Sequence, residues 1–135
     1  MNKKQIGFEQ REFKFRCWDR INKKMIKSPH FSCETSLTTN INKNFKYFSS
    51  VDFIFMQYTG MKDRNEKEIY EGDIVKFEHS TREFTIREVV YVFSHCCFSL
   101  KYQGRTDNFG LPRDWKDSFE VIGNIFENKD LLKNN

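Results

Sequence analysis

The chain has 135 residues, and its 23 Lys and Arg against 19 Asp and Glu give a net charge of +4 with the three His neutral. It contains no alanine and only five leucines, but ten isoleucines and fifteen phenylalanines, a composition that disfavours helices and suits strands. These numbers predict neither a helical bundle nor a membrane-spanning protein, because no apolar run approaches the roughly 20 residues that cross a bilayer.

The N-terminal part of the chain carries most of the positive charge. Residues 1–27 hold nine basic and three acidic side chains, a balance of +6. The first residues, MNKKQIGFEQR, lack an apolar segment behind the basic start, so we expect no secretion signal. The four cysteines are expected to be reduced thiols, which indicates a cytoplasmic protein. We expect residues 1–10 to form an arm and residues 11–132 a single β domain.

The first predicted strand follows the arm. Apolar residues stand at 13, 15 and 17 and charged residues at 12, 14 and 16, the period of two that is typical of a strand with one buried face. The Lys and Arg side chains are then expected to form a solvated face. Met25 and Ile26 are the return strand of a hairpin.

The next segment has no sustained pattern. Residues 27–50 are rich in Ser, Thr, Asn and Lys, and we interpret them as a variable insertion. Residues 53–58 are a continuous apolar run, which predicts a buried strand that ends at Thr59 and Gly60. Residues 62–68 are charged and are expected to form a surface turn.

The second half of the chain reads as further strands separated by turns. They are predicted at 69–70, 74–77, 84–93, 98–102 and 118–126. The strand 84–93 is apolar on both faces and is expected to be central. Gly72 suits a tight turn with positive φ, and Gly123 indicates a bulge or a close backbone approach. Asn128 is a predicted N-cap for a terminal helical turn over 129–133.

Phenylalanine placement gives a further expectation. Phe13 and Phe15, and likewise Phe53 and Phe55, stand on alternating positions of predicted strands. We therefore interpret the excess of phenylalanine as the filling of a small barrel.

No pattern predicts a catalytic, cofactor or metal site. The six glycines are never spaced as a nucleotide-binding loop requires, and there is no Cys-x-x-Cys pair for zinc. Four carboxylates lie close together at Glu66, Glu68, Glu71 and Asp73, but the basic residues among them favour solvation, with Asp73 bonding local backbone. No set of residues converges on a reaction, so we do not expect an enzyme.

Several segments resemble the successive signatures of the YopX family, which are small proteins of bacteriophages and prophages. The segments are 11–19, 22–26, 56–63, 68–75 and 120–128. The resemblance implies an all-β fold with the character of a small, partly open SH3-like barrel, a phage gene outside the structural set, and residence in the host cytoplasm. It implies no established activity.

The chain departs from the family pattern at three places. Asn65-Glu66 stands where family members carry Asn-Gly, so a wider reversal is expected there. Cys96 and Cys97 stand where the turn between the two long strands commonly holds glycine. The terminal helical turn lacks the proline that favours a helix start.

A cluster of large rings and cations is the candidate binding surface. The residues are Lys14, Arg16, Trp18, Tyr58 and Tyr70. Rings beside turn residues are typical of strand ends at a barrel rim, and the same residues could line one concave surface that grips a peptide or a base.

The leading hypothesis for function is a non-enzymatic phage accessory protein that binds a host or phage protein, with host takeover or anti-defence as roles. The alternative is a nucleic-acid-binding factor that uses the basic, aromatic N-terminal strand. The third is an enzyme of unknown type. Self-association to a homo-oligomer is a further expectation, and neither a membrane nor a cofactor is expected as a partner.

Overall fold

The computed structural model describes residues 12–27, 52–80, 82–107, 110–111 and 113–133. The predicted arm 1–10 and, apart from residue 27, the predicted insertion 27–50 lie outside these residues. Within the described part, strands dominate and the remaining elements are short 3-10 turns, so the predicted all-β fold is confirmed. No helix in this part of the chain has the length and apolar character needed to cross a membrane.

Two antiparallel sheets make up the fold. The first has the order β2-β1-β3-β4 and the second β8-β7-β6-β5-β9. The strands are β1 Phe15–Asp19, β2 Lys24–Lys27, β3 Phe53–Lys62, β4 Glu68–Tyr70, β5 Asp73–Glu78, β6 Phe84–Val92, β7 Cys97–Tyr102, β8 Arg105–Thr106 and β9 Phe119–Asn124. The 3-10 turns are η1 Phe93–His95, η2 Arg113–Ser118 and η3 Lys129–Leu132.

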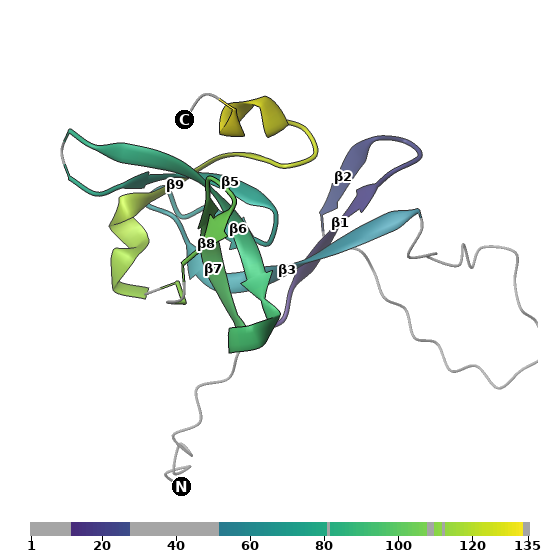
Figure 1. Ribbon diagram of the computed structural model, residues 1–135. Helices are drawn as coiled ribbons and strands as arrows, with labels where there is room; N and C mark the ends of the chain where they lie inside the picture. Colours follow the sequence, from purple (N-terminus) through teal and green to yellow (C-terminus); the bar gives the residue numbers. More distant parts are fainter. Residues whose placement is uncertain (1–11, 28–51, 81, 108–109, 112, 134–135) are drawn as a thin grey trace, which may run out of the picture.

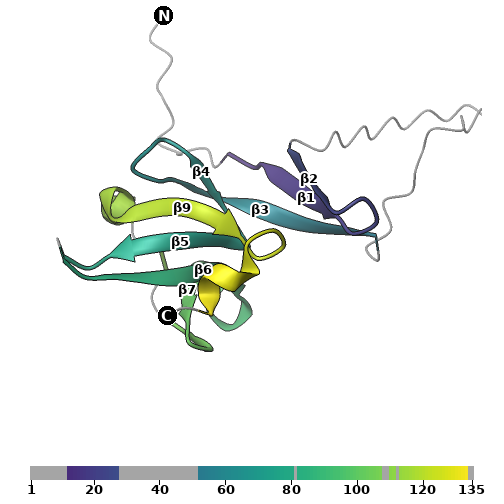
Figure 2. The same cartoon turned by 90° about the horizontal axis from the view of Figure 1, so that it is seen from above.

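The β1–β2 hairpin projects to one side of the five-stranded sheet, and β3 joins the two regions (Figure 1). Seen from above, β9, β5, β6 and β7 run side by side and curl around the end of β3 and β4 (Figure 2). The core fills the space inside this curl. Its buried members are Met61, Ile69, Val75, Phe77, Val89, Leu100, Phe119 and Val121.

Local chemistry explains where β1 ends. The Asp19 carboxylate accepts hydrogen bonds from the backbone N–H groups of Ile21 and Asn22 at 3.0 and 2.9 Å, which closes the hairpin turn. Lys23 takes a positive φ of 50° just before β2 begins.

Strand β3 is longer than the sequence predicted. It was expected to end at Thr59 and Gly60, but it continues to Lys62 and pairs with β4. Gly60 has a φ of +87°, and the register shifts between Tyr58 and Lys62. The glycine therefore makes a β-bulge that redirects the strand and does not end it.

Two of the three departures from the family pattern, Asn65-Glu66 and Cys96-Cys97, lie in loops. Each contains a residue in the left-handed backbone conformation. Five residues join β3 to β4, and the N–H of Asp63 donates to the carbonyl of Lys67 at 2.8 Å, so the chain reverses over the three residues 64–66. Glu66 has a φ of 62°. The predicted wider reversal is therefore confirmed. Cys96 likewise has a φ of 51°, so both residues occupy conformations that favour glycine.

The C-terminal turn forms without its expected cap. Asn128 stands at the N-cap of η3, but its side chain makes no capping hydrogen bond. Its Oδ1 instead accepts from the backbone N–H of Asn124 at 3.2 Å. The prediction of a capping role for the Asn128 side chain was wrong, because β9 lies close enough to take that oxygen.

Gly123 lies at a bulge and at a close approach, as predicted. In the pairing of β5 with β9, Ile74 faces Gly123 and Val75 faces Val121, so Ile122 is the extra residue. A Cβ on Gly123 would lie 2.6 Å from Oδ1 and 2.7 Å from Cβ of Asn128.

We expect Gly123→Ala to lower the free energy of unfolding by about 1–3 kcal/mol, because the added methyl group overpacks this contact. Urea unfolding measures the change. Gly110→Ala is the matched control, since its Cβ would make only ordinary contacts of 3.6 Å or more. Equal losses in the two variants would contradict the close approach.

Candidate functional site

The five residues of the predicted binding surface do not all lie together. Lys14 Nζ is 5.3 Å from the centre of the Tyr58 ring, and the Arg16 guanidinium carbon is 4.8 Å from that of Tyr70. The two tyrosine ring centres are 5.5 Å apart, so these four residues form one cluster. Trp18 lies elsewhere and stacks on the ring of Phe126 at 5.2 Å.

Each cation of the cluster also has a carboxylate of its own. Lys14 Nζ donates to Glu68, and this contact raises the pKa of Lys14. The hydroxyl of Tyr70 donates to the other Glu68 oxygen at 2.8 Å, and burial together with this hydrogen bond raises the pKa of Tyr70 to about 12. Lys14 and Tyr70 are therefore partnered within the fold.

Arg16 and Asp73 form a buried ion pair. Arg16 Nη2 lies 2.6 Å from Asp73 Oδ1, with the two side chains only 12% and 1% exposed. Asp73 Oδ2 also accepts from the backbone N–H of Tyr70 at 2.8 Å, the local bond predicted from the sequence. Burial raises the pKa of Asp73, and the charge of Arg16 acts against that increase.

This pair corrects two expectations from the sequence. The charged face of β1 was predicted to be solvated, but Arg16 is covered, and Asp73 is buried where a solvated acid was expected. The reason is tertiary: the turn between β4 and β5 lies against Arg16 of β1. A strand buried on both faces needs a partner for every charge.

The turn from Glu71 to Asp73 also joins the two sheets through its backbone. The N–H of Glu71 donates to the carbonyl of Gln57 on β3 at 3.0 Å, and the N–H of Gly72 donates to Val89 on β6 at 2.8 Å. The carbonyl of Gly72 accepts from Ile125 at 2.9 Å. Segments far apart in the sequence therefore meet at this turn.

Asp63 is a second buried carboxylate, although the charged residues 62–68 predicted a surface turn there. It is fully buried, its Oδ1 accepts from the backbone N–H groups of Asn65 and Lys67 at 2.8 and 2.9 Å, and its Oδ2 accepts from Val121 at 2.8 Å. Its carboxylate ties the β3–β4 loop to β9. The two turn contacts are local and could have been predicted, whereas the contact with β9 had no signal in the sequence.

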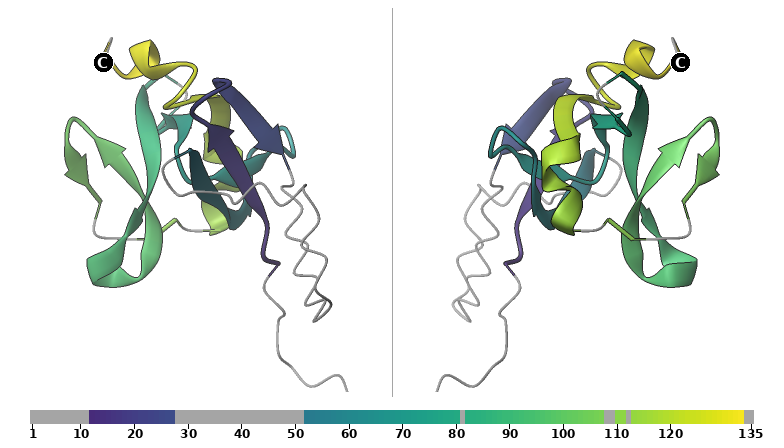
Figure 3. Two further views of the ribbon diagram at one scale, coloured as in Figure 1. Left: turned by 90° about the vertical axis from the view of Figure 1, so that its right-hand side faces the viewer. Right: turned by 90° about the vertical axis from the view of Figure 1, so that its left-hand side faces the viewer.

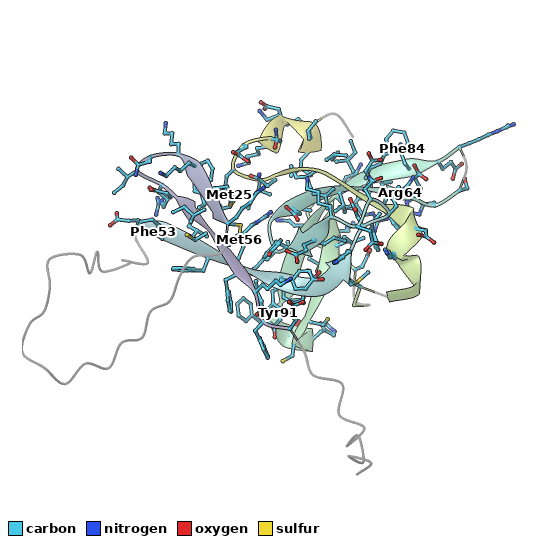
Figure 4. All side chains as sticks on the ribbon, turned by 180° about the vertical axis from the view of Figure 1, so that it is seen from behind. Met25, Phe53, Met56, Arg64, Phe84 and Tyr91 are labelled. Atoms are coloured by element: carbon cyan, nitrogen blue, oxygen red, sulfur yellow. The ribbon has the colours of Figure 1, made fainter. Side chains whose placement is uncertain are left out.

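An open groove lies beside this cluster, between β3 and the β6–β7 hairpin. It has a volume of about 560 Å³, within the range of ligand sites. Tyr58 from β3 lines one side, and Tyr91, Phe93 and Phe98 line the other. We call this the aromatic groove. Tyr91 lies at the end of the molecule where β1 begins, away from Phe84 (Figure 4).

The rings of the hairpin form one cluster. Tyr91 packs edge to face on Phe93, with ring centres 5.3 Å apart, and on Phe98, with ring centres 5.2 Å apart. Phe93 is nevertheless 85% exposed. The turn η1, which contains Phe93, joins β6 to β7 at one end of the hairpin (Figure 3). A ring as exposed as that of Phe93, packed on a second ring of the same hairpin, favours a binding role.

The interpretation of the phenylalanine excess as barrel filling holds for only part of the described rings. Phe77 and Phe119 are buried in the core, but Phe13, Phe84 and Phe93 are exposed by more than half. The core takes its volume mainly from aliphatic side chains. The sequence missed the aromatic groove because an apolar residue at a strand end gives the same pattern whether it is buried or exposed.

The described residues contain no group of three or more His, Cys, Asp and Glu that could hold a metal ion. Cys17, Cys96 and Cys97 are free thiols. The groove contains rings, backbone and two acidic residues, Glu12 and Glu71, and this set can bind a partner through apolar and charged contacts.

Comparison with known proteins adds the family and one structural relative. The family model described as YopX protein matches residues 14–133. The crystal structure of protein EF1440 from Enterococcus faecalis is similar over 91% of this chain and 99% of that one, with 25% identity and a TM-score of 0.62. No curated protein matches the chain.

Proposed function

This chain belongs to the YopX protein family, and from that premise we propose that it is a non-enzymatic accessory protein of a phage or prophage that binds a host or phage protein in the host cytoplasm. The observation that carries the proposal is the exposed ring of Phe93 in the lining of the aromatic groove. Rings at the centre of an interface commonly supply much of its binding energy. A host-takeover or anti-defence role is part of this proposal.

The cluster around Arg16 and Tyr70 has a different role in this proposal. Its cations and carboxylates are paired with one another, and Tyr58 is buried against them. These contacts hold the β1–β2 hairpin against the segment from Glu68 to Asp73. They therefore fix the position of the β3 backbone that lines the groove.

We expect Phe93→Ala to weaken binding of the partner protein by about tenfold or more, the effect of losing one central aromatic contact. The matched control is Phe84→Ala, which removes a ring of the same kind, 52% exposed, at the opposite end of β6. The measurement is capture of host and phage proteins by the tagged chain from infected cells, quantified by mass spectrometry. A partner retained equally by both variants would exclude the groove as its site.

The nucleic-acid alternative stays a prediction. The contacts weigh against the N-terminal strand as its site, because Lys14 and Arg16 already pair with Glu68 and Asp73. A mobility-shift assay at about 0.15 M salt, where surface charges are screened as in cells, tests it directly. Light scattering tests the expectation of a homo-oligomer.

A further inference from the structure

The aromatic groove differs in charge from the rest of the chain. The chain carries a net charge of +4, yet the described residues that line the groove include Glu12 and Glu71 and no Lys, Arg or His. A partner that enters the groove therefore meets negative charge and ring faces.

Glu71 has no charge partner of its own in the described part of the chain. The guanidinium of Arg16 contacts the backbone carbonyl of Glu71, at 3.3 Å, and forms its ion pair with Asp73. Burial raises the pKa of the Glu71 carboxyl, and a hydrogen bond with the backbone of Gln57 acts against it. A carboxylate held ionised in such a setting destabilises the fold. Residues of this kind are common at functional sites.

The chain repeats one arrangement beside the groove. Lys14 lies over the ring of Tyr58 and pairs with Glu68, and Arg16 lies over the ring of Tyr70 and pairs with Asp73. Each is a set of a cation, a ring face and a carboxylate. The groove holds rings and a carboxylate, and its described lining supplies no cation.

We propose that the aromatic groove receives a lysine or arginine side chain of the partner protein, with the cationic head at Glu71 and the aliphatic stem on the rings of Tyr91 and Phe93. The inference rests on the proposed function and names the chemistry of the residue that the groove recognises. Glu12, which pairs with Lys14 at 2.9 Å, is the second acidic residue of the described lining. A cation over a ring and beside a desolvated carboxylate gains from both contacts.

The test uses pools of short peptides of neutral residues that differ only at one central position. One pool carries arginine there, one lysine, and one citrulline, which has the shape of arginine without its charge. We expect the full chain to bind the arginine and lysine pools about tenfold more tightly than the citrulline pool in fluorescence anisotropy. Equal binding of the three pools would overturn the proposal.

The matching change in the protein is Glu71→Gln, which removes the charge and keeps the size of the side chain. We expect it to remove the preference for arginine over citrulline and to leave the thermal midpoint at neutral pH unchanged or raised, because the neutral amide avoids the cost of burying the charge. Glu83→Gln, on the exposed β5–β6 loop outside the groove, is the control and should keep the preference. A preference that survives Glu71→Gln would contradict the assignment.

Different results would contradict the cation site at Glu71 and the binding of a partner protein. A captured partner that depends on Phe93 but binds Glu71→Gln normally leaves the binding function standing and overturns the cationic ligand. An arginine pool that binds through Glu71, without any captured protein that depends on Phe93, supports the cation site and contradicts the proposed protein-binding role.

Discussion

Replacing Asp63 with alanine is expected to lower the free energy of unfolding by about 3–5 kcal/mol, since each buried donor left without an acceptor costs about 1–3 kcal/mol. The substitution removes the acceptor of three backbone N–H groups, those of Asn65, Lys67 and Val121. The side chain is fully buried, so the folded chain offers these groups little water. Urea unfolding followed by intrinsic fluorescence measures the loss.

Two control variants separate the hydrogen bonds from simple truncation. Asp63→Asn keeps one carbonyl oxygen for the two turn donors but directs an amide towards Val121, so we expect an intermediate loss. Asp107→Ala is the surface control, because Asp107 is about half exposed and pairs with Arg87. A loss in Asp63→Ala no larger than that of Asp107→Ala would show that the β3–β4 loop does not depend on this carboxylate.

Arg16→Met is expected to lower the free energy of unfolding by about 3–5 kcal/mol at neutral pH, the cost of removing one partner of a buried ion pair. The methionine keeps most of the stem volume but leaves Asp73, 1% exposed, without its cation. Lys14→Met, at the position just before β1, is the matched control. Its ion pair with Glu68 is partly exposed and screened by solvent, so Lys14→Met should lower the free energy of unfolding clearly less than Arg16→Met.

The stability loss in Arg16→Met is also expected to depend on pH, in a direction set by the Asp73 carboxyl. Burial already raises the pKa of Asp73, and without Arg16 it rises further. A carboxyl whose pKa is higher in the folded than in the unfolded chain contributes stability at low pH, and this contribution is lost as the pH rises through the folded value. We therefore expect the difference between Arg16→Met and the parent chain to shrink from neutral pH towards about pH 4, the unfolded value.

A double substitution checks the same contact. Arg16→Met with Asp73→Asn removes both charges and keeps an acceptor for the N–H of Tyr70. We expect the pair of changes to recover most of the stability lost in Arg16→Met alone, since the buried unpaired charge is gone. Losses that simply add, with no dependence on pH, would rule out a charge contact between the two residues.

Several features of the fold could be predicted because they depend on local sequence. Alternation over 12–17 and the apolar run 84–93 predicted β1 and the central strand β6. Gly72 predicted a tight turn, and Cys96 stands where the family commonly has a turn glycine. Both residues have a positive φ. The family resemblance also rested on local segments, and the family model confirms it over 14–133.

The candidate site was predicted only in part. Lys14, Arg16, Tyr58 and Tyr70 do meet, but in a paired cluster in which Arg16 and Tyr58 are covered, and Trp18 lies apart on Phe126. The open rings of the groove were not singled out. Their neighbours in the sequence are strand and turn residues like those of any hairpin.

The sequence by itself determined most of the strands, most of the turns and the family, because hydrophobic period and left-handed backbone are properties of neighbouring residues. The tertiary structure alone decided which face of each strand is covered. Arg16 and Asp73 are 57 residues apart, and Asp63 and Val121 are 58 apart, so no local pattern records that they meet. The same long-range packing leaves Phe93 exposed in the lining of a groove that Glu71 also lines, and that arrangement is what points to a binding function.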